Sequence, residues 1–231
     1  MRGGYRLGWY FLLSLQVTVL VRALPLEARP KDGRRPKLEI TIWVYNYAQV
    51  SAHTLNQGKT EVARLFHGVG VNINWLECPI SLEQVQRNSV CQQRMLPSEL
   101  ALEILPTFSA PTGPGVDNRL GYSQTFSDGQ HGHYAYLSYE QVENLVSGQD
   151  WSVSEILACV AAHEIGHLLL RSNAHSPNGI MRAQWNRRDL EDSAQGQLQF
   201  TPEQAQVIRA EVDARMRQQQ AIEFSEISSS N

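Results

Sequence analysis

The sequence lacks three features that would each indicate a particular class of protein. Its 231 residues show no internal repeat and no block of basic residues interleaved with aromatic ones. We therefore expect neither a repeat architecture nor a nucleic-acid partner. After the first 23 residues no apolar run is long enough to suggest a membrane span. The composition is that of an ordinary globular protein with a formal net charge of -3, and its length suits one domain with a core of its own.

The amino terminus differs in composition from the rest of the chain. Arg2 and Arg6 precede an apolar stretch from Trp9 to Val21 that contains no acidic residue. This pattern is typical of a secretory signal peptide over 1–23, with a membrane anchor as the alternative. The stretch is shorter than the roughly 20 apolar residues of a membrane span, which favours the signal peptide. We expect a secreted protein, extracellular or periplasmic, that has no membrane partner once the signal is removed.

Three cysteines are consistent with that compartment. Cys78 and Cys91 flank a polar segment, so a disulfide between them would close a surface loop in an oxidising environment. Cys159 lies one helical turn before His163 in an apolar stretch. We expect it to be a buried free thiol that packs as a small apolar side chain.

Alternating apolar residues predict five strands, with a helix as the alternative for the third of them: 38–45, 71–76, 100–105, the short edge strand 120–124, and 134–139. Apolar periodicity and capping residues predict five helices: 51–67, 82–87, 140–146, 152–170 and 201–220. A strand, a helix and a strand in close succession indicate a parallel pair with a right-handed crossover. We therefore predict an α/β (α+β) domain over 37–220, with a mixed, mostly parallel sheet, a buried helix at 152–170 and a C-terminal helix. An extended lead-in at 24–36 precedes this domain, and a disordered tail at 221–231 follows it.

The candidate catalytic motif is His163-Glu164-x-x-His167, within the apolar stretch 161–170. Residues four apart on a helix lie on nearly the same face, so both imidazoles can bind one metal ion. Glu164 lies about 100° around the helix from His163, close to the metal but free to hold a water molecule. Two histidine ligands and a general base in this spacing are typical of zinc hydrolases.

A third protein ligand is expected, because a catalytic zinc ion usually has three and keeps one position open. His175 is the first candidate, because it lies in a turn just after the helix, where the turn-forming residues 176–179 allow the chain to fold back. Glu191 is the alternative. His131 and His133, with Asp128 nearby, suggest either a second metal site or a solvated loop beside the cleft, and the loop is favoured.

The motif, the later His175 and the run Gly179-Ile180-Met181 resemble the metzincin metallopeptidases. The usual family pattern has a glycine where Leu170 stands and its third histidine where Asn173 stands, so His175 comes two residues late. Asn173 can supply a left-handed turn. The resemblance implies a zinc-dependent metalloendopeptidase in which Glu164 is the general base and Met181 packs beneath the metal.

The same resemblance suggests how a substrate binds. An extended peptide or protein substrate would pair with the edge strand, which makes Gly121, Tyr122 and Ser123 the candidate substrate-binding residues. We expect a monomer. The alternative function is a secreted zinc-binding module of the same fold that binds a partner without catalysis. The presence of Glu164 favours the enzyme, because a non-catalytic relative would be free to lose it.

Overall fold

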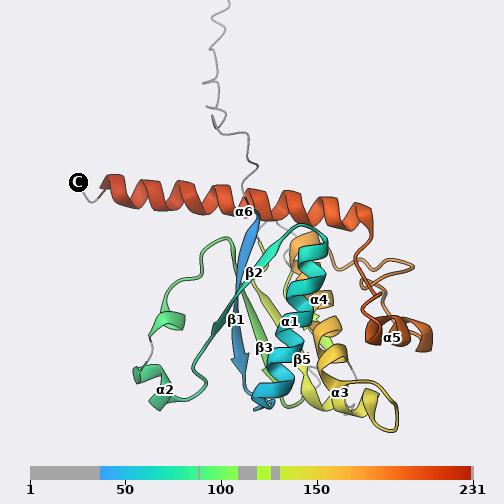
Figure 1. Ribbon diagram of the computed structural model, residues 1–231. Helices are drawn as coiled ribbons and strands as arrows, with labels where there is room; N and C mark the ends of the chain where they lie inside the picture. The colour runs from blue at the N-terminus through green and yellow to red at the C-terminus, as the bar shows by residue number, and fades with distance from the viewer. Residues whose placement is uncertain (1–36, 88, 109–118, 126–130, 230–231) are drawn as a thin grey trace, which may run out of the picture. The chain divides into compact units, whose positions relative to one another are not determined.

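A five-stranded mixed sheet, in the order β2-β1-β3-β5-β4, forms the centre of the fold (Figure 1). Its strands are β1 (Glu39–Asn46), β2 (Asn72–Glu77), β3 (Glu99–Leu105), β4 (Gly121–Ser123) and β5 (Tyr134–Ser138). All neighbours pair in parallel except β4, which is antiparallel to β5 and ends the sheet. The computed structural model describes residues 37–87, 89–108, 119–125 and 131–229. The predicted signal peptide and lead-in lie outside the described residues.

The strands confirm the predicted fold class, and each boundary lies within one residue of its expected position. The segment for which a helix was the alternative is the strand β3. It pairs with β1 on one side and β5 on the other, and most of its residues are buried. Pairing on both sides therefore outweighs the helical propensity of its alanine, leucine and glutamate residues.

Two helices pack against each other and against the sheet: α1 (Ala52–Gly68) and α4 (Val153–Leu170). The Ser51 hydroxyl accepts a hydrogen bond from Thr54 N and caps α1. The short helix α3 (Tyr139–Val146) packs against α4. The side chains of α4 are buried on all sides along most of its length, because α1, α3, α5, α6 and the strands β4 and β5 surround it.

The apolar composition of α4 follows from this central position. Among the described residues, it is the helix with the length and hydropathy of a membrane span. However, 78% of that stretch is buried inside the protein. The core helix of a globular domain has the same composition.

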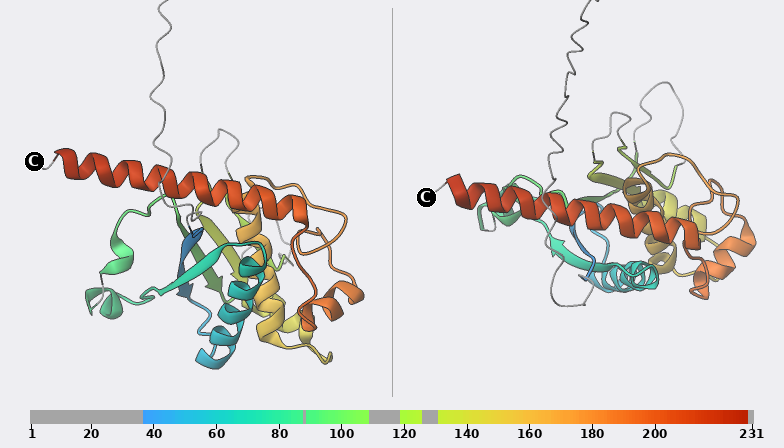
Figure 2. Two further views of the ribbon diagram at one scale, coloured as in Figure 1. Left: turned by 45° about the horizontal axis from the view of Figure 1, so that its top comes forward. Right: turned by 90° about the horizontal axis from the view of Figure 1, so that it is seen from above.

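Two helices at the carboxyl end differ from expectation. The helix α5 (Arg187–Ala194) was not expected. It begins with a capping box, in which the Asn186 side chain accepts a hydrogen bond from Asp189 N and the Asp189 carboxylate accepts one from Asn186 N. The final helix α6 (Pro202–Ser229) crosses the end of the sheet where β1 begins (Figures 1 and 2). It continues to Ser229, so residues 221–229 form the last turns of a helix where a disordered tail was predicted.

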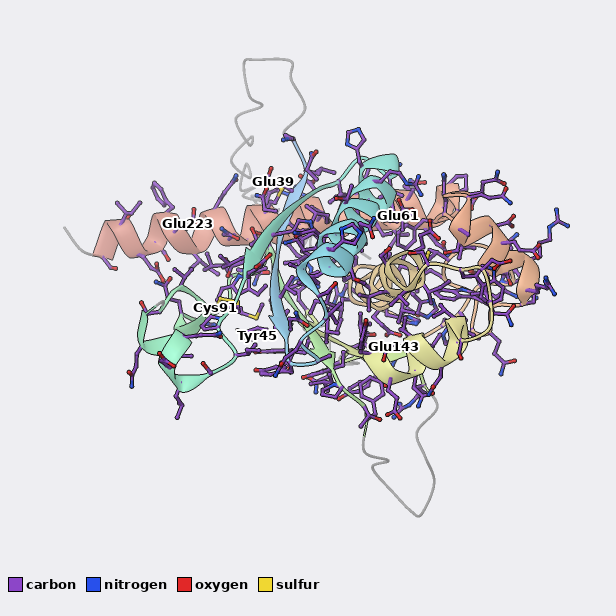
Figure 3. All side chains as sticks on the ribbon, turned by 60° about the horizontal axis from the view of Figure 1, so that its bottom comes forward. Glu39, Tyr45, Glu61, Cys91, Glu143 and Glu223 are labelled. Carbon is purple, nitrogen blue, oxygen red and sulfur yellow. A yellow bond between two sulfur atoms is a disulfide. The ribbon has the colours of Figure 1, made fainter. Side chains whose placement is uncertain are left out.

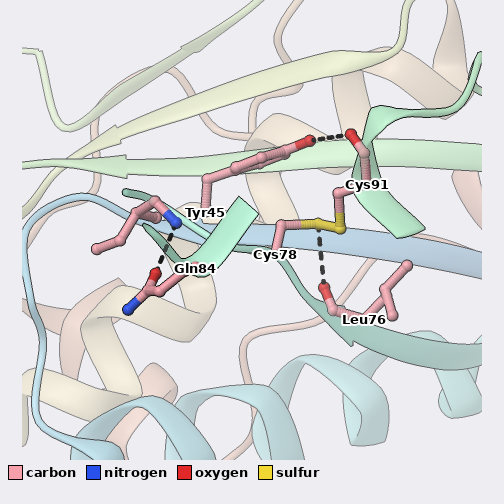
Figure 4. Close-up of a disulfide and its surroundings, with 6 residues drawn as sticks. Tyr45, Leu76, Cys78, Gln84 and Cys91 are labelled. Carbon is pink, nitrogen blue, oxygen red and sulfur yellow. Dashed lines mark hydrogen bonds between the residues drawn. A yellow bond between two sulfur atoms is a disulfide. The ribbon is translucent and has the colours of Figure 1, made fainter. Parts of the chain in front are cut away.

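The expected disulfide is present. Cys78 and Cys91 are bonded, and the closed loop carries α2 (Leu82–Arg87) and the 3₁₀ turn Val90–Gln92. The Tyr45 hydroxyl lies 3.5 Å from the carbonyl oxygen of Cys91, so β1 contacts this loop (Figures 3 and 4). Cys159 is buried and free, as predicted, with its Sγ atom 2.8 Å from Ser193 Oγ.

Candidate metal centre

The carboxyl-terminal half of α4 carries His163, Glu164 and His167, all of them buried. The helix places both histidines on one face, since they are four residues apart. Burial in the core means that each polar atom of these side chains needs a partner. The partners determine which atoms remain available to a ligand.

Backbone carbonyls bind one nitrogen of each imidazole. His163 Nδ1 donates to Ile180 O at 2.7 Å, and His167 Nδ1 donates to Ser172 O at 2.7 Å. Because a carbonyl can only accept, each Nδ1 carries a proton. The neutral ring then has its lone pair on Nε2, which is the tautomer that binds metals. The same carbonyl contacts fix the orientation of both rings.

The two Nε2 atoms face each other at a distance of 3.1 Å. Burial lowers the pKa of His163 to about 4 and also lowers the pKa of His167, so both rings are neutral at neutral pH. Two lone pairs at this distance repel each other unless a cation lies between them. Tetrahedral zinc with Zn–N bonds of 2.0–2.1 Å would separate two nitrogen ligands by about 3.3 Å. The pair therefore fits a zinc ion.

His175 completes a group of three. Its ring centroid lies 5.3 Å from that of His163 and 4.9 Å from that of His167. One ligand atom from each of the three histidines lies within 4.8 Å of the others, and no second group of this kind occurs among the described residues. Glu191, the alternative ligand, lies on α5 and pairs with Arg187 at 2.9 Å. The structure thus brings His175, and not Glu191, to the two helix histidines.

The chain reaches His175 through a turn that differs from the expected one. Arg171 adopts the left-handed conformation, with a φ of 51°, and its N–H donates to His167 O. The predicted left-handed residue, Asn173, has no positive φ and instead accepts from Thr125 Oγ1 through its side chain. The prediction for Asn173 is therefore wrong. Because α4 ends at Leu170, the reversal occurs at the next residue.

Met181 packs directly beneath α4. Its side chain is fully buried, and a Cβ atom on Gly166 would lie only 2.6 Å from its Sδ atom. Gly166 lies between the two helix histidines, so the missing side chain leaves room for the thioether below the site. The preceding residue, Ile180, supplies the carbonyl that accepts from His163 Nδ1 and also from Trp185 Nε1 at 3.2 Å. Met181 therefore supports the helix that carries two of the candidate ligands.

Glu164 faces the edge strand. Burial raises the pKa of Glu164 to about 7, while the Ser123 hydroxyl and the Arg119 guanidinium oppose the shift. A Cβ atom on Gly121 would lie 2.7 Å from Glu164 Cγ. Of the three residues predicted to bind substrate, Gly121 and Ser123 thus lie on the face of β4 that is turned towards Glu164. Tyr122 points to the opposite face of the sheet, where it stacks on Tyr136 at 4.6 Å.

The other candidate histidines have partners elsewhere. His131 contacts Glu211 at 2.7 Å, and His133 Nδ1 donates to Glu99 O at 2.7 Å. Asp128 lies outside the described residues. The sequence gives no signal for the carbonyls of Ile180 and Ser172 as histidine partners, because every residue type has a backbone carbonyl.

Comparison with known proteins identifies structural neighbours only. No protein-family model and no curated protein matches the chain. One similar solved structure is an archaemetzincin from Methanopyrus kandleri, at 11% identity over 78% of this chain and 98% of that chain, with a TM-score of 0.49. Another is metalloproteinase-II from Bacteroides fragilis, at 12% identity over 76% of this chain and 53% of that chain, also with a TM-score of 0.49. This chain thus spans about half of the Bacteroides protein. At these values neither structure assigns an activity to this chain.

Proposed function

We propose that this protein is a secreted zinc-dependent metalloendopeptidase. The observation that carries the proposal is the pair of buried, neutral histidines whose Nε2 atoms face each other at 3.1 Å. His175 lies beside this pair and provides a third imidazole. Three nitrogen ligands with one further position open is the arrangement of catalytic rather than structural zinc sites.

In this proposal three histidines bind the metal ion and Glu164 transfers the proton. His163, His167 and His175 would bind the zinc ion. When bound, zinc supplies Lewis acidity, which makes a water molecule easier to deprotonate and a carbonyl easier to attack. The Glu164 carboxylate accepts the proton of the attacking water and later donates it to the leaving amine. Its burial against β4 keeps this proton away from bulk solvent.

The edge strand gives the substrate class. β4 ends the sheet, and its Gly121 lies against Glu164. An extended peptide can pair with such a strand through main-chain hydrogen bonds, which position the scissile bond and are largely independent of the peptide's sequence. We therefore propose an unfolded or extended polypeptide as the substrate.

Secretion is supported by two independent features. The amino-terminal stretch has the composition of a signal peptide, and the Cys78–Cys91 disulfide suits an oxidising compartment. Transfer of a fused reporter enzyme across the membrane by residues 1–23 tests this part of the proposal. Failure of the reporter to leave the cytoplasm would contradict secretion without bearing on the peptidase activity.

The peptidase activity is tested with Glu164→Gln, which keeps the size of the side chain and removes the base. We expect the variant to retain one zinc ion per chain and to cleave an unstructured protein at least about 100-fold more slowly than the wild type. Glu155→Gln, which makes the same charge change in the first turn of α4, is the control and should cleave normally. Equal cleavage by the wild type and Glu164→Gln would contradict the mechanism. A zinc-loaded wild type without activity would favour the non-catalytic binding module.

A further inference from the structure

A second cluster of residues lies on the face of the sheet that points away from α4. Tyr45 of β1, Glu103 of β3 and Tyr136 of β5 are aligned in register across three neighbouring strands. Side chains alternate between the two faces of a strand. Val44, Leu102 and Leu137, each next to one of these residues, belong to the core beneath the helices. Tyr45, Glu103 and Tyr136 therefore project from the opposite face.

Tyrosine rings surround Glu103. Neighbouring strands are about 4.8 Å apart, so Tyr45 and Tyr136 lie one strand spacing to either side of it. Tyr47 stacks on Tyr45 with ring centroids 5.9 Å apart, and Tyr134 stacks on Tyr136 at 6.4 Å. The rings of each pair are nearly parallel, at 9° and 17°. Tyr47 and Tyr134 are 39% and 38% exposed, so solvent reaches the cluster. We call Glu103 with these four tyrosines the tyrosine slot.

Glu103 is partly buried on this face of the sheet. Among the described residues it forms no ion pair and no hydrogen bond. Burial raises the pKa of its carboxyl group, and its negative charge contributes to the raised pKa values of Tyr45, Tyr47 and Tyr136 after the larger effect of their own burial. The internal segments outside the described residues, 88, 109–118 and 126–130, contain no lysine, arginine or histidine that could pair with it. A half-buried carboxylate without a partner is uncommon in a folded protein.

We propose that the tyrosine slot binds the guanidinium group of an arginine side chain on a partner protein. The faces of tyrosine rings attract cations, and the Glu103 carboxylate can accept two parallel N–H bonds from a guanidinium. A guanidinium is flat, stacks on aromatic rings and is weakly hydrated, whereas an ammonium is compact and strongly hydrated. Paired parallel rings around a carboxylate therefore suit arginine better than lysine.

The surrounding structure makes the slot rigid before binding. The Tyr45 hydroxyl lies 3.5 Å from Cys91 O in the disulfide-closed loop (Figure 4). Tyr136 is stacked on Tyr122 at 4.6 Å on its other side. Rings that are already ordered lose little conformational entropy when a ligand binds. The slot and Glu164 lie on opposite faces of the sheet, so the inference does not depend on the proposed peptidase activity.

The test is a titration of the protein with N-acetyl-arginine amide, followed through the NMR signals of the tyrosine rings. We expect saturable shifts in the slot tyrosines and weaker binding of N-acetyl-lysine amide and of choline. Glu103→Gln should weaken arginine binding at least about tenfold, and Tyr47→Leu should weaken it less. Both variants should fold, because neither removes a bonded or fully buried group. Glu226→Gln, the same charge change at an exposed site on α6, is the control and should bind as the wild type does.

Several results would overturn the proposal. Absence of saturable shifts both in the wild type and after replacement of Arg29, Arg34 and Arg35 by glutamine excludes the slot as a cation site. Equal binding by Glu103→Gln and the wild type excludes it as well. Tighter binding of choline or lysine amide excludes the guanidinium as its ligand. Arg29, Arg34 and Arg35 of the same chain are also candidates for the slot. If arginine amide binds only after these three are replaced by glutamine, the chain's own arginines fill the slot and a partner protein is excluded.

Discussion

Gly121 and Glu164 lie so close together that a Cβ atom at position 121 would be 2.7 Å from Glu164 Cγ and 2.8 Å from its Oε1. A third atom, Tyr136 O, would lie 2.9 Å away. The main chain of β4 therefore fixes the position of the candidate general base. A residue predicted to bind substrate has a second role, because only glycine leaves room for the carboxylate.

We expect Gly121→Ala to displace the Glu164 side chain without removing a metal ligand. A misplacement of about 1 Å at a reacting group can cost about 100-fold in rate. Peptide cleavage should therefore fall by about this factor, while zinc content stays at the wild-type level. Gly68→Ala is the control, because nothing lies within 4 Å of a Cβ atom at that position. Loss of zinc from Gly121→Ala would show that the substitution disturbs the whole site and not the base alone.

The third ligand is tested by zinc affinity. His175→Ala should lower the affinity by more than about 100-fold, because even residues that only support a ligand contribute 10- to 100-fold. Glu191→Gln should bind zinc as the wild type does, since Glu191 pairs with Arg187 on α5. Competition with a zinc-sensitive dye measures both variants. The reverse result, with zinc binding lost in Glu191→Gln and kept in His175→Ala, would contradict the assignment.

A buried ion pair within α6 lies against the carboxyl end of α4. Arg215 is fully buried; its Nε donates to Glu211 Oε1 at 2.8 Å and its Nη2 donates to Leu168 O at 3.3 Å. Arg215→Leu would leave the Glu211 carboxylate buried without this partner, so we expect the free energy of unfolding to fall by about 3–5 kcal/mol. Arg217→Leu breaks an exposed pair with Asp213 and should cost no more than about 1 kcal/mol. Urea denaturation of the two variants gives the comparison, and similar losses would contradict the role of Arg215.

The strands β1 and β2 follow closely from the sequence, because their apolar residues recur with a period of two. The core helix α4 is equally clear, since its apolar residues occur on all sides. The three histidines could be grouped in advance because two of them share a helix and the third follows within a few residues. Local patterns are thus sufficient where the structure depends on neighbours in the chain.

The structure differs from the predictions where it depends on contacts between residues that are far apart in the sequence. The unpredicted helix α5 begins at a capping box but has few apolar residues, so its sequence resembles a solvated loop. The contact of Gly121 with Glu164 and the alignment of Tyr45 with Glu103 depend on strand order and register. Neither is visible in the sequence before the sheet is assembled. The left-handed turn at Arg171 depends on where α4 ends, which its apolar pattern does not specify to the residue.

His133 makes a predictable contribution to pH dependence. Burial lowers the pKa of His133 below its usual value of about 6.5. The unfolded chain therefore binds this proton more readily than the folded protein. The contribution of His133 to stability is complete above about pH 6.5 and is lost as the pH falls towards the lower folded pKa. We expect His133→Asn to lose less stability than the wild type between neutral and mildly acidic pH.

Urea denaturation of the wild type and of His133→Asn, at neutral and at mildly acidic pH, measures how much stability each protein loses. The histidines of the metal centre are present in both proteins. Their contributions therefore cancel when the free energy of unfolding of the variant is subtracted from that of the wild type. His53→Asn, on the exposed side of α1, controls for loss of an imidazole as such. Equal losses of stability in the wild type and His133→Asn would contradict the prediction.

The free thiol of Cys159 should be unreactive in the native protein. Burial raises the pKa of Cys159 to about 12, although the hydrogen bond with Ser193 acts in the opposite direction. Only the thiolate is a nucleophile, so alkylating reagents at mildly alkaline pH should leave the folded protein unmodified. In denaturant without reductant one thiol per chain should react, because Cys78 and Cys91 are joined; after reduction all three should react. Mass spectrometry counts the modified cysteines, and rapid labelling of Cys159 in the native protein would show that the core around α4 opens at this point.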